Sequence, residues 1–180
     1  LPMQSITTSV LSRILLSALF ALTFTMSVCA QTNTKTKVAC IGDSLTRGYL
    51  LEDAQSSYPA QLQQLLGAQY EVRNFGHTSS YVIDDGPVEY RNTEDYTAAI
   101  QYDADILIFM FGANDVGAYN FTPLYFQNQY RELIDSFRQT KKHPKIYLII
   151  APDSRDLHFG LIQQTIQPVM TLGQQLPATV

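Results

Sequence analysis

Short apolar segments that alternate with helical patterns constrain the fold of this chain most. Residues 105–111 are nearly all apolar, and strand-like segments also occur at residues 37–41, 70–75 and 145–150. A strand that is apolar on both sides is typical of a parallel sheet covered by helices on both faces. The sequence therefore predicts an α/β fold, with a flavodoxin-like three-layer α/β/α arrangement and a parallel sheet. Four strands are present, and a fifth is expected after residue 176 but missing.

Helical patterns connect these strands. Ser57 at a cap position and Gly67 at the end predict a helix over residues 57–66. Further helices are expected from residue 93, over residues 122–141 and over residues 160–173. The first three helices each lie between two strand segments, as a parallel sheet requires because its crossovers are long, and the last helix follows the fourth strand segment.

The first thirty residues have the pattern of a secretory signal peptide. Arg13 precedes an uncharged apolar stretch at residues 14–28, and residues 28–30 (Val-Cys-Ala) fit a small-residue cleavage site. The stretch is too short to span a bilayer comfortably. We therefore expect an exported protein, periplasmic or extracellular, without stable membrane insertion after cleavage. Lipidation of Cys29 is a minor alternative, because Val28 is bulkier than the residue that normally precedes a lipidated cysteine.

The rest of the chain is long enough for one domain with a core. Residues 31–36 are polar and predicted to be a flexible lead-in, and residues 37–180 are predicted to form the domain. The formal net charge is −4 and there is no basic run, so nucleic acid is not an expected partner. Cys40 is the single cysteine after residue 30 and is expected to be a buried, unreactive thiol. No spacing of ligands for a metal or another cofactor occurs.

Three of the strands are followed at once by small or amide residues. Residues 42–45 (Gly-Asp-Ser-Leu), 74–76 (Asn-Phe-Gly) and 112–115 (Gly-Ala-Asn-Asp) hold these positions. Because open α/β sheets bind ligands at the carboxyl edge of their strands, we expect the three segments to meet at one rim. A serine hydroxyl at that rim indicates a serine hydrolase. Asp43 and Asp115 are expected to brace the loops rather than to react.

The three segments, in this order, resemble the first three sequence blocks of the SGNH hydrolases, also called the GDSL esterase/lipase superfamily. The resemblance implies that Ser44 is a nucleophile that attacks an ester carbonyl and forms an acyl-enzyme. It also implies that the Gly76 N–H, the Asn114 side-chain amide and the N–H of Ser44 form an oxyanion hole. Removing one such donor typically costs about 10²–10³ in rate. Neither a metal nor a cofactor is implied.

The fourth block of this family, Asp-x-x-His, supplies the general base and is absent from the sequence. His143 precedes a proline at a helix end, and His77 is expected to contact solvent. His158 follows the fourth strand with two aspartates nearby, and is kept as a candidate base. Since the sequence ends where the fifth strand should begin, we expect a chain truncated at its carboxyl end. Without the fourth block it is expected to be inactive as written.

The expected substrate is an ester of a small molecule or carbohydrate. Within the family, the segments are similar to an exported branch that acts on acetylated carbohydrates, which implies removal of O-acetyl groups. Four aromatic residues lie on the loops expected near the site: Tyr81, Tyr90, Tyr119 and Phe121. Two interpretations are open for them, since they either stack on sugar rings or pack at the bases of the loops. A lysophospholipase or thioesterase is the enzymatic alternative, and predicts an apolar groove near Ser44. A non-catalytic carbohydrate-binding relative would bind sugar without hydrolysis.

Overall fold

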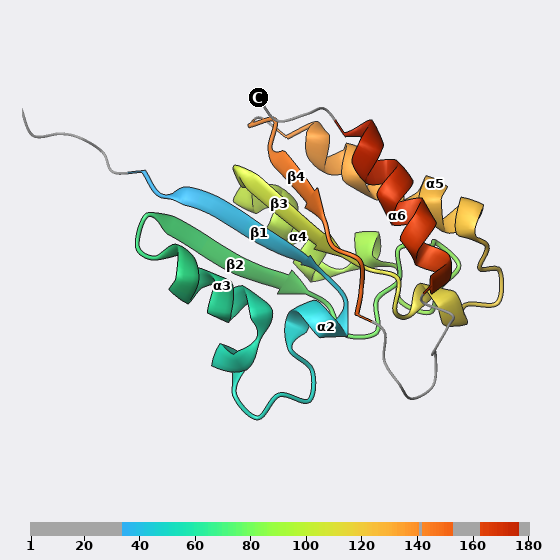
Figure 1. Cartoon of the computed structure of the whole chain (residues 1–180), viewed down its shortest axis with the longest axis horizontal. Helices are drawn as coiled ribbons and strands as arrows, with labels where there is room; N and C mark the ends of the chain where they lie inside the picture. Colours follow the sequence, from blue (N-terminus) through green and yellow to red (C-terminus); the bar gives the residue numbers. More distant parts are fainter. Residues whose placement is uncertain (1–33, 141, 153–162, 177–180) are drawn as a thin grey trace, which may run out of the picture. The chain divides into compact units, whose positions relative to one another are not determined.

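The computed structural model describes residues 34–140, 142–152 and 163–176. All of these except Thr34 belong to a compact unit that begins at Lys35. Four parallel strands form one sheet in the order β2-β1-β3-β4 (Figure 1). Their bounds are β1 Thr36–Gly42, β2 Tyr70–Gly76, β3 Ile106–Met110 and β4 Lys145–Leu148. The predicted α/β fold with a parallel sheet is confirmed. The predicted signal peptide and the position of a fifth strand lie outside the described residues.

Helices follow the strands in the expected alternation. Their bounds are α2 Ser44–Arg47, α3 Tyr58–Leu66, α4 Glu94–Tyr102, α5 Pro123–Arg138 and α6 Gln163–Gln175. Thr93 and Thr122 cap α4 and α5, because each side chain accepts a hydrogen bond from the N–H three residues later. Ser57 precedes α3 as expected, but its hydroxyl donates to the Ala54 carbonyl and does not cap the helix.

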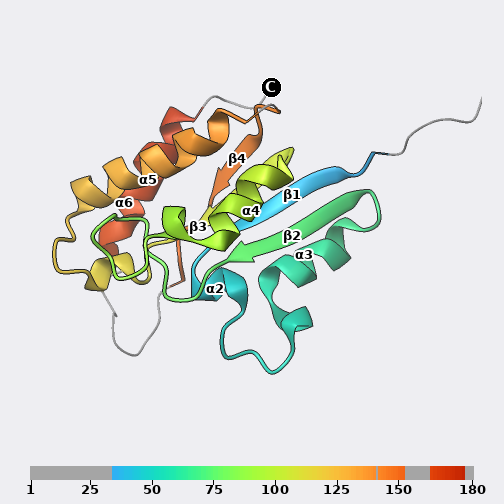
Figure 2. The same cartoon turned by 180° about the vertical axis from the view of Figure 1, so that it is seen from behind.

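One face of the sheet carries the main core. Because side chains alternate across a strand, Ala39 and Ile41 point to the same face as Leu107 and Phe109, which are their partners on β3. All four are buried in one cluster with residues of α4, α5 and α6. Figure 2 shows α4 in front of β1 and β3 on this side. Phe109 makes edge contacts with two rings of α5, so this layer is fixed by aromatic packing.

The opposite face is only partly covered. Here α3 packs against β2, and the Tyr58 hydroxyl at its start lies 3.5 Å from Thr46 Oγ1 of α2. Burial raises the pKa of Cys40 to about 12, so the thiol is unreactive as predicted. Tyr147 on β4 is 51% exposed. Within the part of the chain that the structure describes, β4 pairs on one side only.

No helix among the described residues is long and apolar enough to cross a membrane. The same residues contain no group of three histidine, cysteine, aspartate or glutamate side chains that could hold a metal ion.

Candidate active site

The strand ends that carry the three sequence segments lie at one edge of the sheet. Gly42 of β1 is paired with Gly76 of β2 on one side and with Met110 of β3 on the other. The His77 N–H extends this pairing by donating to the Gly42 carbonyl, with a nitrogen–oxygen distance of 2.9 Å. The segments that follow Gly42, Gly76 and Met110 therefore leave the sheet side by side, as the sequence predicts.

Ser44 is the first residue of the one-turn helix α2. Asp43 precedes it as the cap, and its Oδ1 accepts a hydrogen bond from the Leu45 N–H at 2.9 Å. Gly48 ends the helix in the left-handed conformation, with φ of 85°. No acceptor for the Ser44 N–H is found among the described residues. This N–H is therefore available to a ligand.

Gly76 lies directly against α2. A Cβ atom at this position would overlap the backbone nitrogen of Arg47, so only glycine permits the approach. Its N–H donates to Asn74 Oδ1 at 2.9 Å, and Asn74 Nδ2 donates to the Thr46 carbonyl at 2.9 Å. The N–H that was assigned to the oxyanion hole thus already has an acceptor. The catalytic role of Gly76 stays a prediction, and it requires this bond to break.

The loop after Gly76 turns back toward Asn114. Asn114 Nδ2 donates to the Ser80 carbonyl at 2.9 Å, and Ser80 Oγ donates to the His77 carbonyl at 2.8 Å. Ser79 between them is in the left-handed region, with φ of 62°. Its N–H has no acceptor among the described residues. Ser79 is not predicted from the sequence as a site residue, although a pair of small serines in a segment without periodicity was an available signal.

Two buried carboxyl groups lie beneath this edge. Asp115 Oδ1 accepts from the N–H groups of Val82 and Ile83 at 2.8 and 3.1 Å. Together with the cap made by Asp43, this confirms that both aspartates brace the loops. In each, the second oxygen, Oδ2, is buried and has no partner among the described residues. Burial raises the pKa of Asp43 to about 6 and that of Asp115 to about 7.

The histidines occupy different places. His77 Nδ1 is 2.7 Å from Asp95 Oδ2, and Arg47 Nη1 is 3.6 Å from the other oxygen of Asp95. His77 therefore has a carboxylate partner at the rim, and the expectation that it merely contacts solvent is wrong. His143 precedes β4 and lies at the opposite edge of the sheet, as expected. His158 lies outside the described residues, so its role as a base stays a prediction.

The aromatic residues near the site are mostly packing residues. Tyr90 is fully buried and its hydroxyl donates to the Phe75 carbonyl at 2.7 Å, so of the two interpretations left open for it, packing is confirmed and stacking on sugar is wrong. Tyr81 and Phe121 are partly buried against the core. Tyr119 is fully exposed and can contact a ligand. No sequence pattern singles out Tyr49, which is 60% exposed on the loop after α2.

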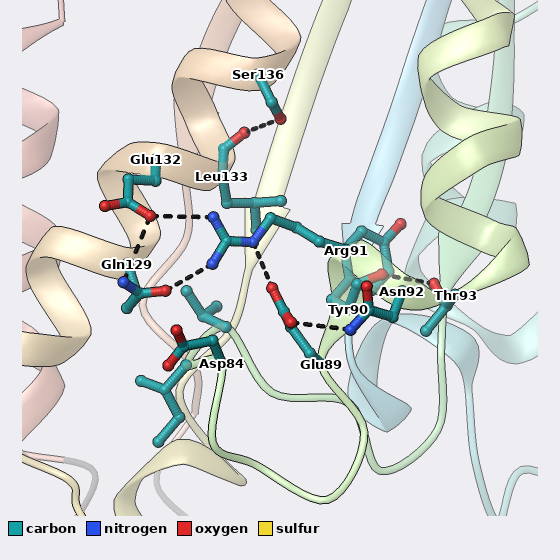
Figure 3. Close-up of polar contacts among 12 residues, drawn as sticks. Asp84, Glu89, Tyr90, Arg91, Asn92, Thr93, Gln129, Glu132, Leu133 and Ser136 are labelled. Carbon is teal, nitrogen blue, oxygen red and sulfur yellow. Dashed lines mark hydrogen bonds and ion pairs between the residues drawn. The ribbon is translucent and has the colours of Figure 1, made fainter.

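A polar clamp ties the loop between β2 and α4 to helix α5 (Figure 3). Arg91 donates to Glu89 at 2.6 Å on its own loop, and to Gln129 and Glu132 of α5 at 2.6 and 3.1 Å. Asp84 and Asp85 add hydrogen bonds to Tyr125 and Asn120. The loop that carries Ser79 and Ser80 is therefore anchored to α5 through its later residues, 84–91.

Similar proteins and structures are acyl hydrolases. Over 80 residues, 44% of this chain, the sequence is 38% identical to an acetylxylan esterase of Xylanibacter ruminicola, and the matched part is 17% of that protein. A lipolytic protein of the G-D-S-L family from Desulfitobacterium hafniense DCB-2 has a similar fold, with a TM-score of 0.60, 21% identity and coverage of 78% of this chain and 73% of that chain. A carbohydrate acetylesterase family member from Sinorhizobium meliloti gives a TM-score of 0.61, with 18% identity and coverage of 78% and 79%.

These structures are less than 25% identical to this chain, so they establish the fold. The family follows from the sequence, because residues 40–177 match the GDSL-like Lipase/Acylhydrolase family. That match covers the sequence segments around Ser44, Gly76 and Asn114, together with β2, β3 and the end of β1. The chain belongs to the GDSL-like lipase/acylhydrolase family.

Proposed function

We propose that this protein is a serine esterase that removes O-acetyl groups from carbohydrates. One observation carries the proposal: a chain of hydrogen bonds joins the Ser44 turn to Asn114. It runs from the Gly42 carbonyl through His77 and Ser80 to the Asn114 amide. The acetyl and carbohydrate specificity is supported by the acetylxylan esterase and the carbohydrate acetylesterase family member that resemble this chain.

The reaction begins at the Ser44 hydroxyl. Its Oγ attacks the ester carbonyl carbon, the sugar hydroxyl leaves, and the acetyl group stays on Ser44 until water removes it. The carbonyl oxygen gains negative charge and accepts hydrogen bonds from the Ser44 N–H and from the Asn114 amide hydrogen that Ser80 does not use. The Ser79 N–H completes this set in our proposal, because it has no acceptor whereas the Gly76 N–H donates to Asn74.

Deprotonation of Ser44 needs a general base, since a serine hydroxyl is a weak nucleophile near neutral pH. No Asp-x-x-His occurs in the sequence, so we expect slow turnover at pH 7 and faster turnover at pH 9, where hydroxide can take the proton. His158 remains the candidate for the base.

Hydrolysis of p-nitrophenyl acetate at both pH values tests the proposal. Asn114→Ala, which keeps the nucleophile, is expected to lose about 10²–10³ of the wild-type rate, and Ser44→Ala is expected to lose at least as much. Mass spectrometry of the quenched reaction should detect one acetyl group on the peptide that contains Ser44. Equal rates for wild type and Ser44→Ala, with no acetyl on that peptide, would refute the assignment.

A lysophospholipase or thioesterase activity is the second candidate, and one observation favours it. Leu45 on the Ser44 helix and Leu50 and Leu51 on the loop after it are exposed, where that activity requires apolar surface. Rates on p-nitrophenyl acetate and p-nitrophenyl decanoate separate the two. A higher kcat/KM on the decanoate would favour the long-chain activity over the acetylesterase.

A further inference from the structure

A cavity of about 440 Å³ lies between α3 and β2, and its rim includes the last residue of α2. Its volume is in the range of small-ligand sites in proteins. Six of the residues that line it are Arg47, Gln55, Ser57, Gln63, Gln64 and Asn74. None of these has a part in the reaction proposed above.

The polar groups of the cavity fall into two sets. Gln63 and Asn74 are used by the fold, because the Gln63 amide bonds Val72, Gly67 and Tyr70 and the Asn74 amide bonds Thr46 and Gly76. Gln55 and Gln64 are exposed, and no hydrogen-bond partner for their side-chain amides is found among the described residues. The cavity thus has a fixed wall and two amide groups that are free to bind.

Arg47 adds a third binding group. Its Nη1 donates to the Gly76 carbonyl at a long distance of 3.4 Å and lies 3.6 Å from Asp95 Oδ1, which leaves the hydrogens of Nε and Nη2 for a ligand. The apolar part of the lining comes from Pro59, Ala60 and Val72. Amide and guanidinium groups over a small apolar floor match a sugar, which has hydroxyls at its edge and C–H groups on its face. They are a poor match for an acyl chain, which would leave these polar groups unpaired.

The cavity is close enough to Ser44 for one polymer chain to occupy both. Arg47 lies three residues after Ser44 on the same helix, which is about 5 Å along the axis. The loop between α2 and α3 closes beside the cavity, since a Cβ at Gly48 would be 2.9 Å from the Cβ of Ser57. Tyr49, next to Gly48 on the same loop, is exposed but does not line the cavity.

We propose that this cavity is a sugar-binding subsite. It holds a pyranose unit that neighbours the acetylated unit in the same polysaccharide, and Gln55, Gln64 and Arg47 bind its hydroxyls. The substrate of the proposed esterase is then a polymer rather than a single acetylated sugar. This assignment rests on the proposed function for the position of the acetylated unit.

Calorimetric titration of the full chain with xylotetraose, which carries no ester, tests binding apart from catalysis. The double variant Gln55→Ala/Gln64→Ala is expected to weaken binding by about tenfold or more. The matched control is Gln101→Ala/Gln139→Ala, which removes two glutamines from a cavity of about 540 Å³ between α4 and α5. That cavity lies toward the opposite end of the sheet, so the control is expected to bind like wild type.

The hydrolysis of p-nitrophenyl acetate provides a separate measurement. The small ester does not reach the cavity, so Gln55→Ala/Gln64→Ala should hydrolyse it at the wild-type rate. Loss of xylotetraose affinity in this variant alone supports the subsite, even where Ser44→Ala proves to be without effect on hydrolysis. No binding by wild type, or equal affinity in all three proteins, overturns it. Binding of decanoate in the cavity in place of xylotetraose also overturns the proposal, because the cavity would then be an acyl site.

Discussion

The buried carboxyl group of Asp115 makes the stability of this protein depend on pH. Its Oδ1 accepts two N–H groups, but its Oδ2 is buried without a partner among the described residues. Burial raises its pKa from 3.8 to about 7, and the neighbouring Asp43 adds to the effect. Because the folded-state pKa lies above the unfolded one, the folded chain binds the proton more tightly. The stabilisation is therefore complete below pH 4 and is lost as the pH rises toward and through 7.

The size of the effect follows from this difference in pKa. At pH 5 the folded chain keeps the proton and the unfolded chain has released it, whereas at pH 8 neither holds it. One pKa unit corresponds to 1.36 kcal/mol, so Asp115 loses about 2–3 kcal/mol of stabilisation between pH 5 and pH 8. In Asp115→Asn the side-chain oxygen can still accept from Val82 and Ile83, but nothing titrates. The variant carries a constant cost for its buried amide hydrogens, about 1–3 kcal/mol.

Urea unfolding of both proteins between pH 5 and pH 8 measures the difference. The free energy of unfolding of wild type minus that of Asp115→Asn should fall by about 2–3 kcal/mol over this range. Asp53→Asn is the matched control, because Asp53 also accepts from a backbone N–H but is exposed. Its difference from wild type should change little with pH. Parallel curves for wild type and Asp115→Asn would refute the reasoning, since they would mean that the carboxyl titrates alike in the folded and unfolded chains.

Three further substitutions test the architecture of the site. Gly76→Ala should lower the free energy of unfolding, measured in urea, by about 1–3 kcal/mol, because the new Cβ overlaps the Arg47 backbone. An unchanged free energy of unfolding would mean that α2 does not pack closely against β2. Ser79→Gly should keep esterase activity and stability within about 1 kcal/mol, because glycine adopts the left-handed conformation and retains the N–H; loss of activity would assign a role to the hydroxyl instead. Arg91→Ala should speed limited proteolysis of the loop before α4, while Arg131→Ala on the exposed side of α5 should not.

The strands were predictable because their signal is local. The run that became β3 is apolar on both sides, and the glycines that end β1 and β2 are visible in the sequence. The predicted strand bounds agree with the structure within about two residues, as residues 37–41 against β1 Thr36–Gly42 illustrate. Helix α2 was missed, because one turn is too short to show a 3.6-residue period. Its cap and its glycine end, Asp43 and Gly48, were the signals that remained.

The loop between β2 and α4 was not predictable in detail, because its anchors are distant in the sequence. Tyr90 is buried by Phe111 and by the Phe75 carbonyl, and no local pattern separates it from an exposed tyrosine. The same holds for Asp115, which bonds Val82 and Ile83 across 33 and 32 residues. The sequence placed the right residue types at the right edge, and tertiary contacts decided which N–H groups remain free.

The contacts of Asn74 illustrate how tertiary structure determines which N–H groups remain free. Its amide group joins two parts of the site, because Nδ2 holds the carbonyl of Thr46 in α2 and Oδ1 holds the N–H of Gly76. To free the Gly76 N–H for a substrate, the Asn74 side chain would have to give up one bond and thereby loosen its hold on the helix that starts at Ser44. The Ser79 N–H needs no such exchange, because it has no acceptor among the described residues. Free hydrogen-bonding capacity thus favours Ser79 over Gly76 as the loop donor of the proposed reaction, with Gly76 as the residue that lets the Ser44 helix pack against the sheet.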